Sequence, residues 1–116
     1  MYKKALRFDP SNASYTGNLG WSYYLCNDND KCIEYSLKAT KADSTAYFAR
    51  FNLGLAYLRS GDILKARQIY SGLKKDMNSI SYQERDGAIK DLLDLKAKGI
   101  YVPETNAILK EFFNYL

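Results

Sequence analysis

Histidine is absent from this 116-residue chain, and proline, cysteine and tryptophan are scarce. Without histidine there can be no Ser-His-Asp triad, no histidine general base and no histidine metal ligand. Two cysteines in a chain of this length do not form a disulfide framework. No Ser, Cys or Lys stands in a recognisable nucleophile motif. We therefore expect a protein that is not an enzyme and that binds no cofactor or metal.

Long apolar runs are missing as well. No stretch approaches the roughly 18 apolar residues of a membrane-spanning helix, so membrane insertion is not expected. The first residues lack the apolar core of a signal peptide. Together with the low cysteine content this favours the cytoplasm, although the sequence specifies no compartment.

Charge of one sign is not concentrated anywhere. The net charge is +4, from 17 Lys and Arg against 13 Asp and Glu, and the only adjacent basic pairs are Lys3-Lys4 and Lys74-Lys75. A nucleic-acid-binding surface would gather Lys and Arg on one face. Nucleic acid is therefore not expected as a partner.

The sequence does contain a repeat of 34 residues. The triplet Asn-Leu-Gly at 18–20 recurs at 52–54, and the same register pairs Tyr23 with Tyr57 without a gap. Within each unit apolar residues recur at helical spacing. The pattern predicts two short helices per unit, over roughly 13–26, 29–42, 45–60 and 62–75.

This pattern resembles the tetratricopeptide repeat, a helical hairpin. The residues that carry the resemblance are Leu19, Gly20 and Tyr23 in one unit and Leu53, Gly54, Ala56, Tyr57, Gly61, Asp62, Ala66 and Tyr70 in the next. The chain departs from the family pattern at Thr16 and Arg50, where Trp is favoured, and at Ser36, where Tyr or Phe is usual. The resemblance implies an all-α fold, a right-handed superhelix of antiparallel helical hairpins.

The repeat register divides a single domain into four segments. Residues 1–12 match the tail of a preceding repeat, 13–46 and 47–80 are repeats, and 81–116 is a divergent repeat or capping helix pair. A hairpin that begins midway through its second helix would leave an apolar face uncovered. We therefore expect this to be the C-terminal part of a longer repeat protein. The alternative is a short natural chain whose leading helix caps the first hairpin.

The C-terminal segment predicts two more helices. Ser81 opens the first with a capping box, and Asp91 and Asp94 are expected on its solvent side, where charge meets water. Phe112 and Phe113 end the second helix. If exposed, they could dock another domain or a second copy of the chain.

The stretch CNDNDKC, from Cys26 to Cys32, packs thiols and carboxylates together as a metal loop might. It lacks both the ligands of a zinc site and the Gly and Glu of an EF-hand loop, and a disulfide across it would be strained. The repeat register instead places Asn27 over Gly61, which predicts a left-handed turn. Asp28 is then expected to cap the next helix, and Cys32 to fill a tight helix crossing.

The resemblance also implies a binding groove, lined in this family by the first helix of each hairpin. The residues expected to project into it are Asn18, Trp21, Tyr24, Phe48, Phe51, Asn52, Leu55 and Arg59. Aromatic anchors with amide side chains suit an extended peptide or a helix. The alternative is that some of these rings pack against an upstream repeat or against the C-terminal helices.

These features predict a non-catalytic protein–protein interaction module. The competing hypothesis is a regulatory or substrate-recruiting arm of an enzyme whose catalytic domain lies outside this sequence.

One subfamily of the tetratricopeptide repeat family binds chaperone tails with two Asn and several basic residues. Asn18 and Asn52 match that Asn pair, but Ser14, Tyr82 and Asp86 stand where basic residues are needed, so chaperone tails are not expected. The partner is not encoded in the sequence.

Overall fold

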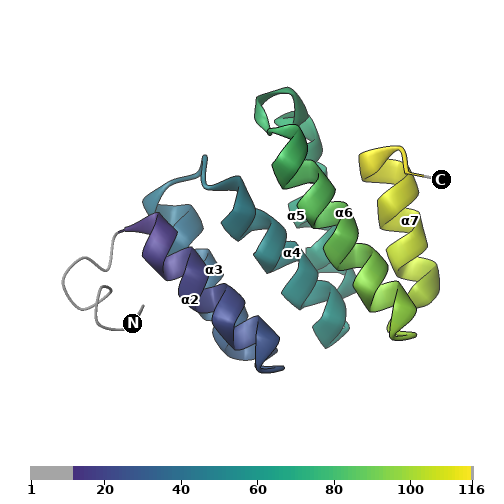
Figure 1. The fold of residues 1–116 in the computed structure, drawn as a ribbon, viewed down its shortest axis with the longest axis horizontal. Coiled ribbons are helices and arrows are strands. Elements are labelled where there is room, and N and C mark those ends of the chain that lie inside the picture. The colour runs from purple at the N-terminus through teal and green to yellow at the C-terminus, as the bar shows by residue number, and fades with distance from the viewer. Residues whose placement is uncertain (1–11, 116) are drawn as a thin grey trace.

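The computed structural model describes residues 12–115, so the expectation for 1–11, the tail of a preceding repeat, lies outside the described residues. Regular structure within 12–115 is entirely helical: α2 (Ala13–Leu25), α3 (Asn29–Ala42), α4 (Tyr47–Ser60), α5 (Ile63–Lys75), the short 3-10 helix η1 (Met77–Ser79), α6 (Tyr82–Ala97) and α7 (Val102–Phe113). Consecutive helices pair as hairpins (Figure 1), which confirms the predicted all-α hairpin solenoid. No helix in this described part has the length and apolar character needed to cross a bilayer.

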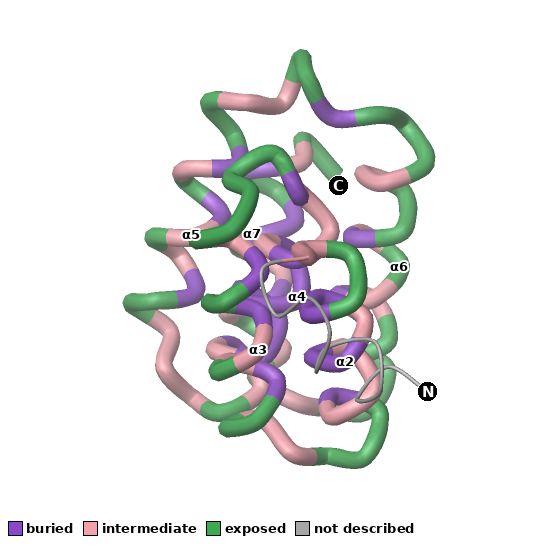
Figure 2. Tube along the Cα trace, turned by 90° about the vertical axis from the view of Figure 1, so that its left-hand side faces the viewer, coloured by how far each residue is buried: buried purple, intermediate pink, exposed green. Residues whose placement is uncertain are grey.

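The helices form two layers. In the first layer α4 contacts both α2 and α6, and in the second α5 contacts α7. Figure 2 shows this arrangement from the side, with α2 and α6 toward one edge, α3 and α5 toward the other and buried residues between them. We call the first layer, made by the leading helix of each hairpin, the α2–α4–α6 layer.

The turns within the first two hairpins have the same construction. Asn27 and Gly61 both adopt left-handed backbone conformations, with φ of 63° and 90°. The Asp28 side chain accepts a hydrogen bond from the Lys31 amide at 3.0 Å, and Asp62 caps α5 in the same way. The prediction that CNDNDKC is a hairpin turn, with Asn27 in the place of Gly, is confirmed.

Small residues let the helices of each hairpin approach closely. A Cβ added to Gly20 would lie 2.9 Å from Ser36 Oγ, and one added to Gly54 would lie 2.9 Å from a ring carbon of Tyr70. Cys32 is fully buried in the same crossing as Gly20, whereas Cys26 is exposed, and both thiols are free. The predicted role of Cys32 as a small packing residue is therefore confirmed.

Helices α6 and α7 cover the open side of the second hairpin. The Ser81 hydroxyl accepts a hydrogen bond from the Glu84 amide at 3.1 Å, as expected for a helix start. The Phe112 ring lies 6.3 Å from Tyr70 and the Phe113 ring 6.1 Å from Phe51, measured between centroids. Phe112 is buried and Phe113 half-buried against the preceding hairpin, so these rings pack within the chain, and the alternative in which both are exposed does not apply.

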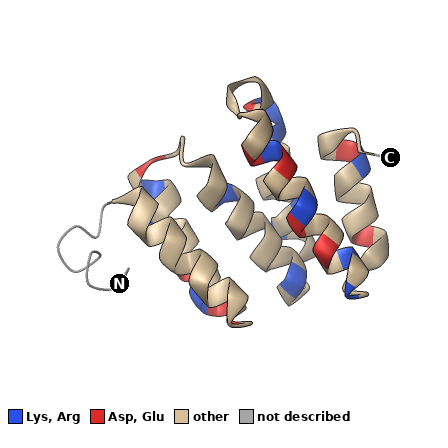
Figure 3. Ribbon diagram, in the orientation of Figure 1, with Lys and Arg blue, Asp and Glu red and all other residues tan. Residues whose placement is uncertain are grey.

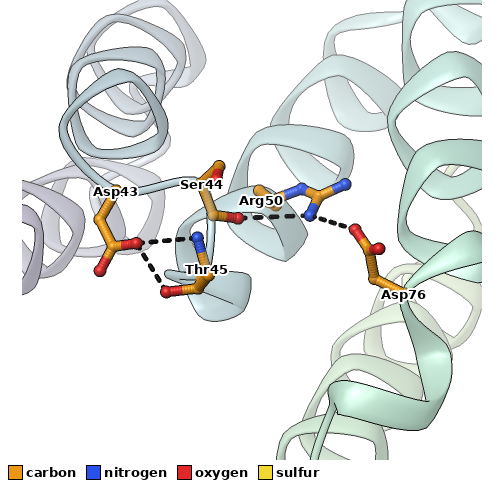
Figure 4. Close-up of polar contacts among 5 residues, drawn as sticks. All are labelled: Asp43, Ser44, Thr45, Arg50 and Asp76. Atoms are coloured by element: carbon orange, nitrogen blue, oxygen red, sulfur yellow. Dashed lines mark hydrogen bonds and ion pairs between the residues drawn. The ribbon is translucent and has the colours of Figure 1, made fainter.

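Arg50, which replaces the Trp that the family favours, forms a polar bridge (Figure 4). Its Nη1 donates to the Asp76 carboxylate at 2.9 Å and to the Ser44 carbonyl at 3.3 Å. The preceding loop is shaped by Asp43, whose carboxylate accepts from the Thr45 amide and hydroxyl at 2.9 and 2.6 Å. These bonds lower the pKa of Asp43. They also hold Thr45 in the loop, so that α4 begins at 47 rather than at the predicted 45.

Candidate functional site

Several residues predicted to project into a groove are buried in the core instead. Phe51 and Leu55 are only 6% and 2% exposed, because α4 is the middle helix of its layer and its far side is covered by α6 and α7. Asn52 is 8% exposed, and its carbonyl accepts a weak bond from the Cys32 thiol at 3.9 Å. For these residues the expected open position is wrong. Phe51 follows the alternative, packing against the C-terminal helices.

Phe48 and Asn18 are partly buried, and neither lines the pocket described next. The Phe48 ring covers Gly17 of α2, where an added Cβ would be 2.5 Å from the ring, so this side chain holds α4 against α2. Asn18 is half-buried, and its carbonyl accepts a bond from the Ser22 hydroxyl at 3.1 Å.

Trp21, Tyr24 and Arg59, by contrast, line a common pocket of about 300 Å³, which we call the Trp21 pocket. Its full lining is Trp21, Tyr24, Leu25, Asn27, Arg59, Asp91, Asp94 and Lys98. Residues from α2, α4 and α6 therefore meet here, at the ends of these helices that lie together at the lower edge of Figure 1.

The aromatic wall of the pocket comes from α2. Trp21 and Tyr24 are one helical turn apart, and their rings stack with centroids 5.1 Å apart and planes within 9°. Trp21 is half-exposed, whereas Tyr24 is buried. Burial raises the pKa of Tyr24 to about 12; the charge of Arg59 opposes this rise and that of Asp91 adds to it. The Tyr24 phenol is therefore neutral at physiological pH.

Arg59 at the end of α4 is held from three directions. Its guanidinium carbon lies 3.5 Å from the centroid of the Tyr24 ring, a close cation–π contact. Its Nε donates to Asn29 Oδ1 at 2.7 Å, and its Nη2 donates to the Tyr24 carbonyl at 2.8 Å. Arg59 thus joins the end of α4 to the α2–α3 turn, through acceptors that are all neutral.

The acidic wall comes from α6. Asp94 pairs with Lys98 at 3.0 Å, whereas Asp91 forms no ion pair within residues 12–115. Burial raises the pKa of Asp91 to about 6; the negative charge of Asp94 adds to the rise and Lys90 opposes it. A carboxyl group whose pKa is shifted by burial in a pocket is a functional-site candidate.

The expectation that Asp91 lies on the solvent side of its helix is wrong, since it is half-buried and lines the pocket. A signal for this position was present in the sequence. Asp91 stands three residues after Ala88 and four before Leu95, which are both buried, so helical spacing places it at the edge of the packed stripe. Asp94 is exposed but also lines the pocket.

Fold and site together define a helical-hairpin repeat protein with a mixed aromatic and charged pocket on its leading helices. The family model for the tetratricopeptide repeat matches residues 13–45, which contain the α2–α3 hairpin. This match covers one hairpin of the chain, and together with the all-helical fold it supports a repeat protein of the tetratricopeptide type. Members of this family are typically non-catalytic, and their repeats generally mediate protein–protein interactions. No curated protein and no solved structure gave a significant match to the chain.

Proposed function

We propose that this chain is an interaction module that holds a peptide or helix of a partner protein on the α2–α4–α6 layer, anchored in the Trp21 pocket. The observation that carries the proposal is the pocket itself. Three successive leading helices contribute to one opening of about 300 Å³, and the half-exposed ring of Trp21 forms part of its wall. Partly open aromatic residues set beside polar groups are frequent energetic centres of protein interfaces.

The distribution of charged residues on the α2–α4–α6 layer supports a ligand that extends across this layer from α2 to α6. Helix α2 carries no Asp, Glu, Lys or Arg, whereas α6 carries both signs along its length (Figure 3). A bound segment would therefore meet an uncharged aromatic surface on one side and a charged surface on the other. Apolar anchors combined with polar contacts are typical of peptide and helix recognition.

Selection of short random peptides on the intact chain tests this proposal. We expect Trp21→Ala to weaken binding of the selected peptides at least ~10-fold, because it removes the anchoring ring. The matched control is Tyr15→Ala, which removes an aromatic side chain from the same helix, 41% exposed and outside the pocket. This variant should bind like the wild type. Fluorescence anisotropy of labelled peptides measures each dissociation constant.

Thermal unfolding of each variant separates lost binding from lost folding. Phe51→Ala is unsuitable as a groove variant, since its buried ring would be lost from the core. Two outcomes would contradict the proposal: that no peptide is selected, or that selected peptides bind Trp21→Ala as tightly as the wild type.

A further inference from the structure

The Trp21 pocket places a half-exposed indole ring and two carboxylates around one opening. We propose that it accepts a cationic side chain, lysine or arginine, from the bound partner, between Trp21 and the carboxylates of Asp91 and Asp94. This inference rests on the proposed function, because it names the chemistry of the group that the pocket selects.

Asp91 supplies the first argument. Its carboxylate is half-buried and forms no ion pair with any other residue of the described chain. Removing a carboxylate from water is unfavourable unless an opposite charge or hydrogen-bond donors replace the water. A ligand ammonium or guanidinium would supply both. Burial and Asp94 already raise the pKa of Asp91, and a bound cation would lower it again.

Asp94 can also turn toward a ligand. Its ion pair with Lys98 joins two exposed side chains within one helix, four residues apart. Such pairs contribute little to stability and exchange readily with solvent. An incoming cation can therefore share the Asp94 carboxylate without breaking any buried contact.

Of the two basic residues that line the pocket, Lys98 pairs with Asp94 at 3.0 Å, whereas Arg59 is held by other contacts. Arg59 is stacked on Tyr24 and bonded to Asn29 Oδ1 and the Tyr24 carbonyl, and it forms no ion pair within residues 12–115. An anionic ligand would have to approach Asp91, whose charge has no partner. A cation would instead meet the two carboxylates and the indole of Trp21, which line the same pocket, and Trp is the aromatic side chain best suited to cation–π contact.

Four pools of labelled peptides, alike in length and otherwise degenerate, test the inference on the intact chain. They carry Lys, Arg, norleucine or Glu at a fixed central position. We expect the Lys and Arg pools to bind at least ~10-fold more tightly than the norleucine pool, which has a similar shape but no charge. They should also change the emission of Trp21, the only tryptophan in the chain, which reports on the pocket directly.

Two substitutions on α6 complete the design. Asp91→Asn removes the unpaired charge and should reduce the preference for Lys and Arg to about two-fold or less. Asp86→Asn is the matched control, because Asp86 is exposed on the same helix and does not line the Trp21 pocket. This variant should retain the full preference. Circular dichroism confirms that both variants are folded.

The outcomes separate the two proposals. If all pools bind equally and Trp21→Ala weakens them all, the pocket binds peptides but does not select cations, and only the inference is wrong. A preference for the Glu pool would also overturn it, since Arg59 and Lys98 would then determine selectivity. If no pool binds, the proposed function fails and the inference fails with it.

Discussion

A carboxyl group that is half-buried beside a tyrosine ring and a second carboxylate takes up a proton more readily than one in water. Asp91 is in this environment, and its pKa rises from the ordinary 3.8 to about 6. The native chain therefore binds this proton more tightly than the unfolded chain does. Between those two pKa values the native state loses stability as the pH rises, because ionisation of Asp91 then opposes folding.

Asp91→Asn should therefore stabilise the protein at neutral pH. At about pH 7.5 we expect the free energy of unfolding to rise by roughly 1 kcal/mol, less than the full shift would give, because the carboxylate is partly exposed and screened. Near pH 4 both chains carry a neutral side chain in the native state, so the difference should nearly vanish. Urea denaturation at the two pH values measures this dependence.

The groups that interact electrostatically with Asp91 or line its pocket are Tyr24, Arg59, Lys90, Asp94 and Lys98. Emission of Trp21 should titrate with a midpoint of about 6 in the wild type and not in Asp91→Asn. The exposed Asp86→Asn variant provides the control. A stability difference of equal size at both pH values would contradict the assignment to Asp91.

Individual site residues could be predicted only in part. Helical spacing and the repeat register predicted that Trp21, Tyr24 and Arg59 project from the leading helices, and all three line the Trp21 pocket. The same reasoning placed Phe51 and Leu55 in the groove. These residues are covered by α6 and α7, which lack the repeat pattern, so the repeat register did not show where these two helices pack. Asp91 was missed although its spacing from Ala88 and Leu95 places it at the edge of the packed stripe, because its neighbours across the pocket belong to α2 and α4, far away in sequence.

At the scale of the helices, the turns of the first two hairpins show that two different residues can occupy the same turn position. Asn27 and Gly61 have similar left-handed backbones, but Asn has a Cβ and bears a modest conformational cost there. The predicted bounds of the helices in the first two hairpins agree with the structure to within two residues. The register could be predicted because each turn is fixed by local chemistry, an αL residue followed by a capping Asp.

Substitutions at Asn27 test this local control. We expect Asn27→Ala to lower the free energy of unfolding by about 1 kcal/mol, because Ala in a left-handed conformation is strained. Asn27→Gly should leave it within about 0.5 kcal/mol of the wild type. Urea denaturation compares the variants. If Ala is tolerated as well as Gly, the left-handed conformation of this turn does not limit stability.

At the scale of the whole molecule, α6 and α7 cover the second hairpin, partly through a group of aromatic rings. The rings of Phe51, Tyr70, Phe112 and Phe113 form one continuous group that joins α4, α5 and α7. The sequence left self-association through exposed Phe112 and Phe113 as an alternative, but these rings pack within the chain. Their engagement depends on contacts between distant segments, which sequence periodicity does not reveal.

Phe112→Ala should reduce the free energy of unfolding by about 3 kcal/mol, because it removes a buried ring from this group. It should also increase self-association, since apolar surface around Tyr70 becomes accessible. Urea denaturation and analytical ultracentrifugation measure the two effects. Tyr115→Ala, at an exposed site near the C-terminus, should change neither. A wild-type dimer that Phe112→Ala converts to monomer would instead restore the self-association hypothesis.

The three-way anchoring of Arg59 has a consequence for how a partner would associate. An arginine side chain that becomes ordered on binding loses on the order of 2 kcal/mol of rotamer entropy. The rotamer entropy of Arg59 is instead lost when the chain folds, because Tyr24 and Asn29 already hold the guanidinium in the free chain. The Arg59 side of the pocket is thus preorganised, and the entropy lost on association falls mainly on the ligand and on the exposed Leu25.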